Sequence, residues 1–204
     1  GSAGTVQLAG DYNLPGPGIL TAGSLVLGNP VDPGSNGSIG TQPIHIDSGA
    51  SLTFCRSDSP TITNTLSGAG TLNLTGSNDG TNSESKFTLA ADNSGFSGVI
   101  SVSNGFLPVK TPQDIGSAAV SMTGRLLLFV EYSTLSNPNH PAPTGAWAHV
   151  SASTGNLTLM DATLAGPIQL GGGTTTWIYS RDDWPSGPVI RNSITGPISE
   201  SGGS

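Results

Sequence analysis

The sequence predicts an all-β chain folded as a parallel β-helix, or β-solenoid, and three observations support this. Gly and Pro account for 30 and 15 of the 204 residues and divide the chain into pieces too short for long helices. Short segments alternate apolar and polar side chains, which is the pattern of half-buried strands. The connections between these segments vary widely in length, whereas antiparallel hairpins favour tight two-residue turns.

Composition separates a folded chain from a disordered one. Hydrophobic residues make up 34% of the chain and charged residues only 9%, whereas disordered chains are usually poor in the former and rich in the latter. We therefore expect the chain to fold. No apolar run approaches the roughly 18 residues of a membrane-spanning helix, so we expect no direct membrane insertion of this segment.

The charge and the cysteine content limit the partners and the compartment. The formal net charge of −7, with only six Lys and Arg residues, argues against a nucleic-acid partner bound through its phosphates. An acidic, sparsely charged surface suits secretion. Cys55 is the single cysteine and cannot form a disulfide within the chain, so we expect it to be a small strand residue. Gly1-Ser2 resembles a cloning remnant, and we expect the chain to be an excised part of a longer protein.

Alternating segments recur along the whole chain and predict strands in this order. Each would present Leu, Ile, Val or Phe on one face and uncharged hydrogen-bonding residues on the other. Each is bounded by Gly, Asn, Asp or Pro. The predicted strands are Thr5–Ala9, Ser24–Leu27, Ile44–Ile46, Ser51–Phe54, Thr71–Leu74, Lys86–Leu89, Val99–Val102, Ala119–Met122, Asn156–Leu159, Pro167–Leu170 and Thr174–Tyr179.

Internal repeats favour a solenoid over a sandwich. Ile62–Gly68 matches Ile190–Gly196 in the pattern I-x-N-[ST]-[LI]-[ST]-G, and Leu164–Ile168 matches Ile194–Ile198 thirty residues later. In a parallel β-helix each coil pairs with its neighbours at about 4.8 Å. Aliphatic side chains then stack inside, and Thr, Ser and Asn form ladders outside. At roughly 20 to 30 residues per coil, we expect about seven to ten coils.

Two long linkers fit the same architecture. Asn29–Ser38 and Ser136–Gly145 contain ten residues each and are rich in Gly, Pro, Asn and Ser. The corners of a solenoid tolerate such insertions because they project outward and need not match each other. We expect any recognition by the chain to lie in such loops, notably Ser136–Gly145 and Ser180–Gly187.

One stretch carries a family resemblance. Leu66–Gly76 reads L-S-G-A-G-T-L-N-L-T-G and resembles the opening of the autotransporter-associated β-strand repeat of bacterial passenger domains, which reads apolar-x-Gly-x-Gly-x-Leu-x-Leu-x-Gly. The segments Asp92–Gly98, Val99–Leu107 and Asp114–Met122 are similar to the later parts of that repeat. The resemblance covers residues 62–128.

The rest of the chain departs from the family pattern. An insertion at residues 78–85 interrupts the repeat, residues 129–190 are irregular and richer in aromatic residues, and residues 193–204 look like a truncated next repeat. We expect residues 1–204 to form one β-solenoid fragment.

The resemblance implies a single-stranded right-handed parallel β-helix with irregular loops. It further implies an exported bacterial protein, secreted or held at the cell surface on the outer side of the outer membrane, in which this segment acts as a stalk or adhesin. A carbohydrate or a host-cell surface would be its partner. The family shares an architecture rather than one activity, so the resemblance transfers no catalytic residue and no cofactor.

Two alternatives remain open: a β-helical enzyme that degrades polysaccharides, and a phage or viral fibre module. An enzyme of this kind needs carboxylates that converge on one face, sometimes with Ca²⁺. The only dense acidic group, Asp182 and Asp183, is flanked by Pro and Gly and is typical of a solvated turn. The sequence contains no metal-binding His spacing and no nucleophile elbow. We expect His45 to face outward from its strand, and we expect no catalytic residue and no metal site.

A cluster of aromatic and charged residues near the C-terminus is the candidate binding site. Aromatic planes beside carboxylate and guanidinium groups are suited to stacking on sugars and hydrogen-bonding them. The same aromatic residues would also suit a hydrophobic plug on the flank of the solenoid. The hypothesis of glycan contact names Trp177, Tyr179, Arg181, Asp182, Asp183 and Trp184.

Overall fold

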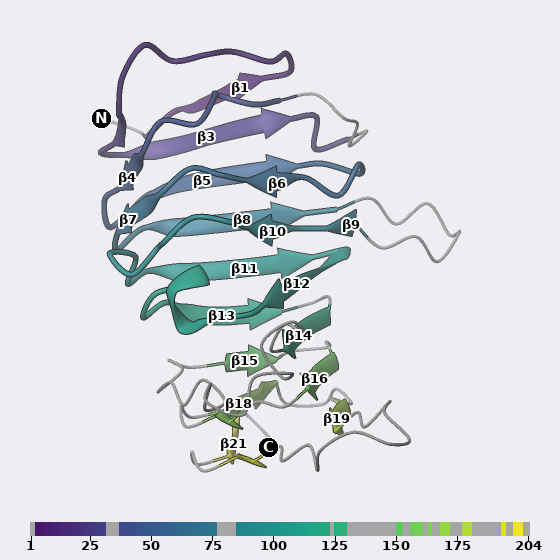
Figure 1. Cartoon of the computed structure of the whole chain (residues 1–204). Helices are drawn as coiled ribbons and strands as arrows, with labels where there is room; N and C mark the ends of the chain where they lie inside the picture. The colour runs from purple at the N-terminus through teal and green to yellow at the C-terminus, as the bar shows by residue number, and fades with distance from the viewer. Residues whose placement is uncertain are drawn as a thin grey trace, which may run out of the picture.

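The fold was obtained as a computed structural model of the whole chain (Figure 1). It describes residues 3–31, 37–76, 85–122, 125–129, 150–152, 156–160, 163–164, 168–171, 177–180, 193–194 and 198–201. Apart from the short 3-10 turn η1 (Pro112–Asp114), these residues contain no helix, so the prediction of an all-β chain is confirmed for them.

The largest element is a nine-stranded sheet. The chain returns to it repeatedly, and we call the route from one of its strands to the next a pass. Figure 1 shows its strands stacked in chain order from the N-terminus to the C-terminus. The strands are β1 (Thr5–Leu8), β3 (Gly23–Gly28), β5 (Ala50–Cys55), β8 (Thr71–Thr75), β11 (Val99–Ser103), β13 (Ala119–Met122), β15 (Val150–Ala152), β18 (Ile168–Gly171) and β21 (Ile198–Ser201).

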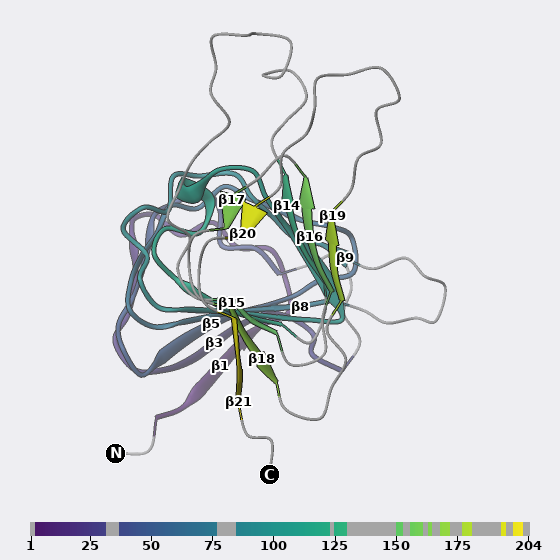
Figure 2. The same cartoon turned by 90° about the horizontal axis from the view of Figure 1, so that it is seen from below.

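Smaller sheets lie on the other sides of the interior, as the view along the stack in Figure 2 shows. One has five strands: β9 (Ser85–Lys86), β12 (Gly105–Val109), β14 (Arg125–Phe129), β16 (Asn156–Met160) and β19 (Trp177–Ser180). Another has three: β2 (Gly18–Leu20), β4 (Ile44–Ile46) and β7 (Leu66–Gly68). Two pairs complete the set, β6 (Thr61–Ile62) with β10 (Thr88–Leu89) and β17 (Thr163–Leu164) with β20 (Ser193–Ile194).

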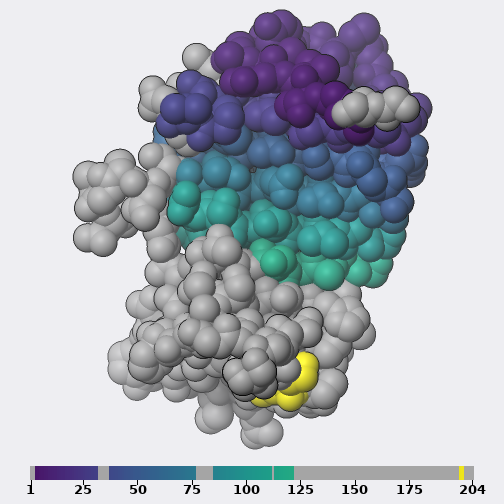
Figure 3. Space-filling view, turned by 180° about the vertical axis from the view of Figure 1, so that it is seen from behind, coloured from purple at the N-terminus to yellow at the C-terminus, as the bar shows by residue number. Residues whose placement is uncertain are grey.

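Every strand pairing recorded between the described strands is parallel. Neighbouring strands are therefore joined by crossovers and not by hairpins. This arrangement is compatible with a β-solenoid and excludes an antiparallel sandwich for the described part of the chain. Figure 3 shows the N-terminal passes packed on one another as successive bands.

Long and short passes alternate. One column of residues, followed from strand to strand of the nine-stranded sheet, advances by 19, 27, 20, 28, 20, 30, 18 and 30 residues. The repeat that recurs after thirty residues is one long pass, because Leu164 pairs with Ile194 and Ile168 with Ile198. The column is Val6, Leu25, Leu52, Leu72, Ile100, Val120, Val150, Ile168 and Ile198.

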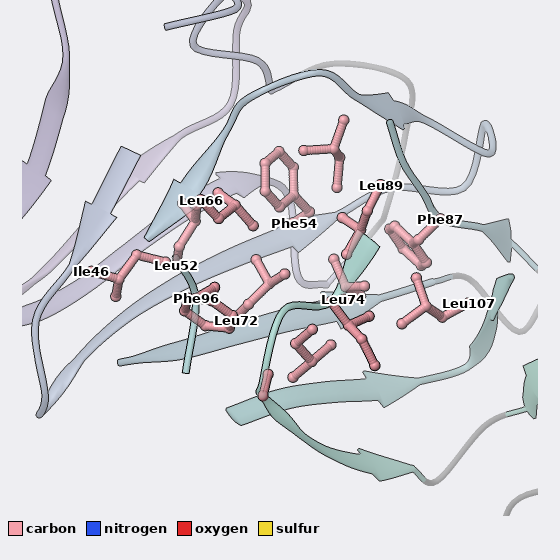
Figure 4. Packing of buried hydrophobic residues seen from close by; sticks show 14 of the residues in the cluster. Ile46, Leu52, Phe54, Leu66, Leu72, Leu74, Phe87, Leu89, Phe96 and Leu107 are labelled. Carbon is pink, nitrogen blue, oxygen red and sulfur yellow. The ribbon is translucent and has the colours of Figure 1, made fainter. Parts of the chain in front are cut away.

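The inner face of the nine-stranded sheet carries an aliphatic core. Leu52, Leu72 and Ile100 stack in consecutive passes, and their side chains are 0% exposed. Side chains from the segments between the strands join the same core, including Phe87 and Phe96, which are also 0% exposed (Figure 4). Burial of this apolar surface is the main favourable term for folding.

The outer face carries hydrogen-bonded pairs of small polar side chains. Between neighbouring passes, Ser51 Oγ donates to Ser24 Oγ at 2.9 Å. Asn73 Nδ2 likewise donates to Thr53 Oγ1 at 3.1 Å. The expected outer ladders of Ser, Thr and Asn are confirmed at these positions. Uncharged groups suit them because equal charges directly opposite each other on neighbouring strands repel.

Small residues occupy the corner at which the chain enters the nine-stranded sheet. A Cβ on Gly98 would lie 1.8 Å from the carbonyl oxygen of Gly70, so no larger residue fits there without moving the backbone. Gly70, the second glycine of the G-x-G pattern in Leu66–Gly76, is constrained in the same way, since a Cβ there would lie 2.5 Å from the carbonyl oxygen of Asp47 and 2.8 Å from that of Ala50. The corner column consists of Gly23, Ala50, Gly70, Gly98 and Ala118.

Most predicted strands are present, with ends that differ by a residue or two among the described residues. The prediction of one strand at Lys86–Leu89 was wrong, because the chain forms two short strands there, β9 and β10, in different sheets. Nine of the described strands are not among the predicted ones. Six of them are two or three residues long and too short to show an alternating pattern: β2, β6, β7, β15, β17 and β20. The other three, β12, β14 and β21, have four or five residues and were missed as well. Cys55 is the last residue of β5 and is 1% exposed, as a small buried strand residue should be. Within residues 129–190, strands β15 to β19 continue the parallel stacking where the chain is described.

We expect Leu72→Ala to lower the free energy of unfolding by about 2–5 kcal/mol, because it leaves a cavity between Leu52 and Ile100. Thr71→Ala, one residue earlier and on the outer face, should cost less than about 1 kcal/mol. Urea unfolding followed by circular dichroism measures both. An equal loss of unfolding free energy in the two variants would contradict the placement of Leu72 in the inner column.

Candidate functional site

A pocket of about 310 Å³ opens beside the C-terminal end of β5. Residues 37–40, which belong to the long pass before β5, form one side of it. Residues 58–64, on the short pass that follows β5, form the other side, and Phe54 and Arg56 complete the lining. The pocket therefore lies between two consecutive passes of different length.

An ion pair spans part of this pocket. Arg56 Nε donates to Asp58 Oδ1 at 2.8 Å and Arg56 Nη2 donates to Asp58 Oδ2 at 2.7 Å. The guanidinium also donates from Nη1 to the carbonyl oxygen of Gly37 at 3.2 Å, which ties the two sides of the pocket together. The side chain of Arg56 is only 12% exposed. A bidentate pair of this kind fixes the orientation of both groups.

The charges around the pocket nearly compensate each other. The hydrogen bond from Arg56 lowers the pKa of the Asp58 carboxyl, and the hydrogen bond to Asp58 raises the pKa of Arg56, so both groups stay charged near neutral pH. Asp11 accepts a hydrogen bond from the backbone N–H of Gly37 at 3.0 Å and adds a second negative charge near the guanidinium. The charged groups around the pocket thus sum to a small negative charge.

A buried asparagine closes the inner end of the lining. Asn64 is 4% exposed and donates from Nδ2 to the carbonyl oxygens of Gly40 at 3.0 Å and Gln42 at 2.7 Å. It is the Asn of the repeated pattern in Ile62–Gly68. Its two donated bonds fasten one pass to the previous one.

Ser59, also in the lining, has a positive φ of 58°. A non-glycine residue in this left-handed region is strained, and such residues concentrate at binding and active sites. Its hydroxyl accepts a hydrogen bond from the backbone N–H of Lys86 in the next pass, which helps to hold the conformation.

A second polar group lies on the outer face of the three-stranded sheet. His45 Nδ1 is 2.9 Å from Ser67 Oγ, and His45 Nε2 is 3.0 Å from Asp47 Oδ1. The side chains of His45 and Asp47 are 46% and 45% exposed, so the expectation that His45 faces outward is confirmed. Serine, histidine and aspartate in this order are the residue types of a nucleophilic triad.

The glycan site predicted from the sequence is described only in part. Trp177 and Tyr179 lie on β19, two residues apart, in register with Asn156 and Thr158 of β16. Arg181, Asp182, Asp183 and Trp184 lie outside the described residues, as do the linker Ser136–Gly145 and the loop residues 181–187. The hypothesis of glycan contact there stays a prediction.

Sequence reasoning missed both groups found in the structure. Ser67 is 22 residues from His45 and meets it only because β4 and β7 pair in register. The R-x-D spacing of Arg56 and Asp58 and the Asn of the repeated pattern were visible signals for the pocket. Within the described residues, no group of three or more His, Cys, Asp or Glu side chains is placed to bind a metal, and no helix has the length and apolar character needed to cross a membrane.

We expect Asp58→Asn to change how stability depends on pH. Because the folded pKa of Asp58 lies below its ordinary value of 3.8, its contribution is present above that value and is lost as the pH falls through the lowered pKa. The difference in free energy of unfolding between the parent chain and the variant should therefore shrink between about pH 5 and pH 2. Urea unfolding of both chains across this pH range measures the difference. A difference that does not change with pH would contradict a stabilising ion pair between Arg56 and Asp58.

Comparisons with protein-family models, with curated proteins and with solved structures found no match for this chain.

Proposed function

We propose that this chain is a structural segment of an exported bacterial surface or secreted protein, a stalk built as a single-stranded right-handed parallel β-helix. The observation that carries the proposal is the unbroken column of aliphatic residues in register through all nine strands of the largest sheet. A structure whose every pass packs only on its neighbours grows along one axis and can serve as a spacer.

A general rule supports the right-handed form that we propose. Crossovers between parallel strands of one sheet are right-handed in about 98% of cases, because a right-twisted strand packs back onto its sheet only in that way. The passes here are crossovers of this kind, which supports the right-handed form over the left-handed one.

The surface chemistry supports export and a spacer role. Charged residues are 9% of the chain, and on the outer face of the nine-stranded sheet Ser51 bonds to Ser24 and Asn73 bonds to Thr53 between passes. Such a face is soluble without attracting nucleic acid. The corner column of small residues gives a physical reason for the glycines on which the resemblance to the autotransporter-associated repeat rests.

The proposal is tested by display on cells. The chain, with an N-terminal epitope tag and a signal peptide, is fused to an outer-membrane β-barrel in a Gram-negative host. We expect the tag to be accessible to antibody on intact cells. We also expect a core fragment to resist added protease, because the described strands are hydrogen-bonded to their neighbours in the adjacent passes.

Leu72→Asp is the matched control, since a charge in the dry core should prevent folding and make the displayed segment protease-sensitive. Equal digestion of both chains, or failure of the parent chain to reach the surface, would contradict the stalk. An experimental structure with left-handed passes would contradict the right-handed helix alone.

The group Ser67–His45–Asp47 favours a second candidate function, hydrolysis of an ester. With its proton on Nε2, His45 donates to Asp47 and can accept the Ser67 hydroxyl proton at Nδ1. The Ser67 oxygen would attack the acyl carbon, the bond to the alcohol would break, and His45 would return the proton to the departing oxygen. Water would then release the acid by the same steps. Gly95 has no side chain to fill the space beside Ser67, where a Cβ would touch Ser67 Cβ at 3.4 Å.

This second function predicts a burst of p-nitrophenol from p-nitrophenyl acetate, about equal to the protein concentration. Ser67→Ala should abolish the burst, whereas Ser51→Ala, which removes another outer-face hydroxyl, should keep it. Release at the buffer rate by the parent chain would contradict the hydrolase and leave the stalk unaffected.

A further inference from the structure

The lining of the pocket beside β5 includes a buried asparagine whose side-chain oxygen has no hydrogen-bond partner among the residues that the structure describes. Asn64 is 4% exposed and lines the pocket, and both of its recorded hydrogen bonds are donated by Nδ2. Its Oδ1 has no hydrogen-bond donor in the part of the chain that the structure describes. A buried acceptor left unsatisfied costs about 1–3 kcal/mol, so it normally meets a water or a ligand.

A comparable asparagine one pass later shows the difference. Asn93 is 1% exposed, its Oδ1 accepts from the backbone N–H of Leu66 at 2.8 Å, and its Nδ2 donates to the carbonyl oxygen of Asp114 at 2.7 Å. Asn93 therefore serves only to join passes. Asn64 joins passes with its nitrogen and keeps its oxygen available.

The remaining polar groups of the pocket select a neutral ligand with hydroxyl groups. Arg56 has five N–H donors, of which three are engaged by Asp58 and Gly37, so two remain for an acceptor. Asp58 neutralises the guanidinium, and Asp11 nearby disfavours an anion. A hydroxyl group can donate to Asn64 Oδ1 and can also accept from Arg56, whereas a carboxylate has no proton to donate and an apolar molecule can do neither.

The pocket also has the size and the apolar surface that such a ligand needs. Its volume of about 310 Å³ is at the lower end of ligand-binding pockets. Ile39, Phe54 and Ile62 lie in its lining beside the polar groups. A ring that carries hydroxyl groups on its edge and C–H groups on its faces matches this mixture.

We propose that the pocket formed by residues 37–40, Arg56 and residues 58–64 binds one unit of a neutral saccharide, with Asn64 Oδ1 accepting from a sugar hydroxyl and Arg56 donating to another. This site is distinct from the aromatic group around Trp177. It extends the proposed stalk by giving its N-terminal passes a recognition function, and it does not require the stalk to be correct.

The test uses glucose, galactose, mannose and N-acetylglucosamine as probes, with glucuronate as the acidic counterpart, in saturation-transfer NMR and calorimetry. We expect at least one neutral sugar to bind and glucuronate to bind more weakly. Thr61→Trp should weaken binding about tenfold or more, since Thr61 is exposed and lines the pocket. Thr88→Trp is the matched control, because Thr88 pairs with Thr61 in the next pass and lies outside the lining.

Circular dichroism and thermal unfolding establish that the Trp variants fold, and Thr63→Trp, also exposed in the lining, provides a second blocking variant. Equal binding by Thr61→Trp and Thr88→Trp would overturn the proposal, as would the absence of binding by any neutral sugar to the parent chain, since the pocket would then hold only water. Neither result bears on display at the cell surface, so failure of this site and failure of the stalk are distinguishable.

Discussion

Parallel, in-register pairing of successive passes is the constraint on which the rest of the structure depends. Strands about 4.8 Å apart place each residue directly on its counterpart in the next pass. An aliphatic residue is therefore stable only on another aliphatic one, as in the column from Leu25 to Val120. Equal charges at one position would repel from pass to pass, which accounts for the uncharged polar pairs of the outer face, such as Ser51 with Ser24. The low charge content is thus a consequence of the stacking.

The same constraint decides where chemistry can arise. Residues distant in sequence meet whenever they occupy neighbouring positions in register, as His45 and Ser67 do. Their proximity requires no local motif. Where the passes match closely, as at Gly98 on Gly70, the backbones leave no space for a side chain. Sites can therefore form on the outer face or where two passes diverge. The group of His45, Asp47 and Ser67 is an example of the first kind, and the pocket beside β5 is an example of the second.

The fold could be predicted from the sequence further than the sites could. Alternation in segments such as Ser51–Phe54 reports burial directly, because each strand residue faces one side only. The register between two strands depends on both strands and cannot be predicted from the sequence of either one alone. The contact of Ser67 with His45 and the different hydrogen bonds of Asn64 and Asn93 could therefore not be predicted from the sequence. The aromatic residues near the C-terminus attracted the prediction of a site because they are rare. The pocket residues are common residue types, and only their positions on neighbouring passes make them a group.

The alternation of long and short passes explains why the pocket lies where it does. The pass from Leu25 to Leu52 advances 27 residues and the next, to Leu72, only 20. Inside, both must present the same column to the core, so the difference in length has to be absorbed at a corner. Residues 37–40 belong to the longer pass and residues 58–64 to the shorter one, and the pocket lies between them. Arg56 and Asn64 bridge that space with bonds to Gly37, Gly40 and Gln42, which hold the two routes at a fixed separation. A hollow produced by unequal pass lengths is thereby made rigid, and a rigid hollow is what a binding site requires.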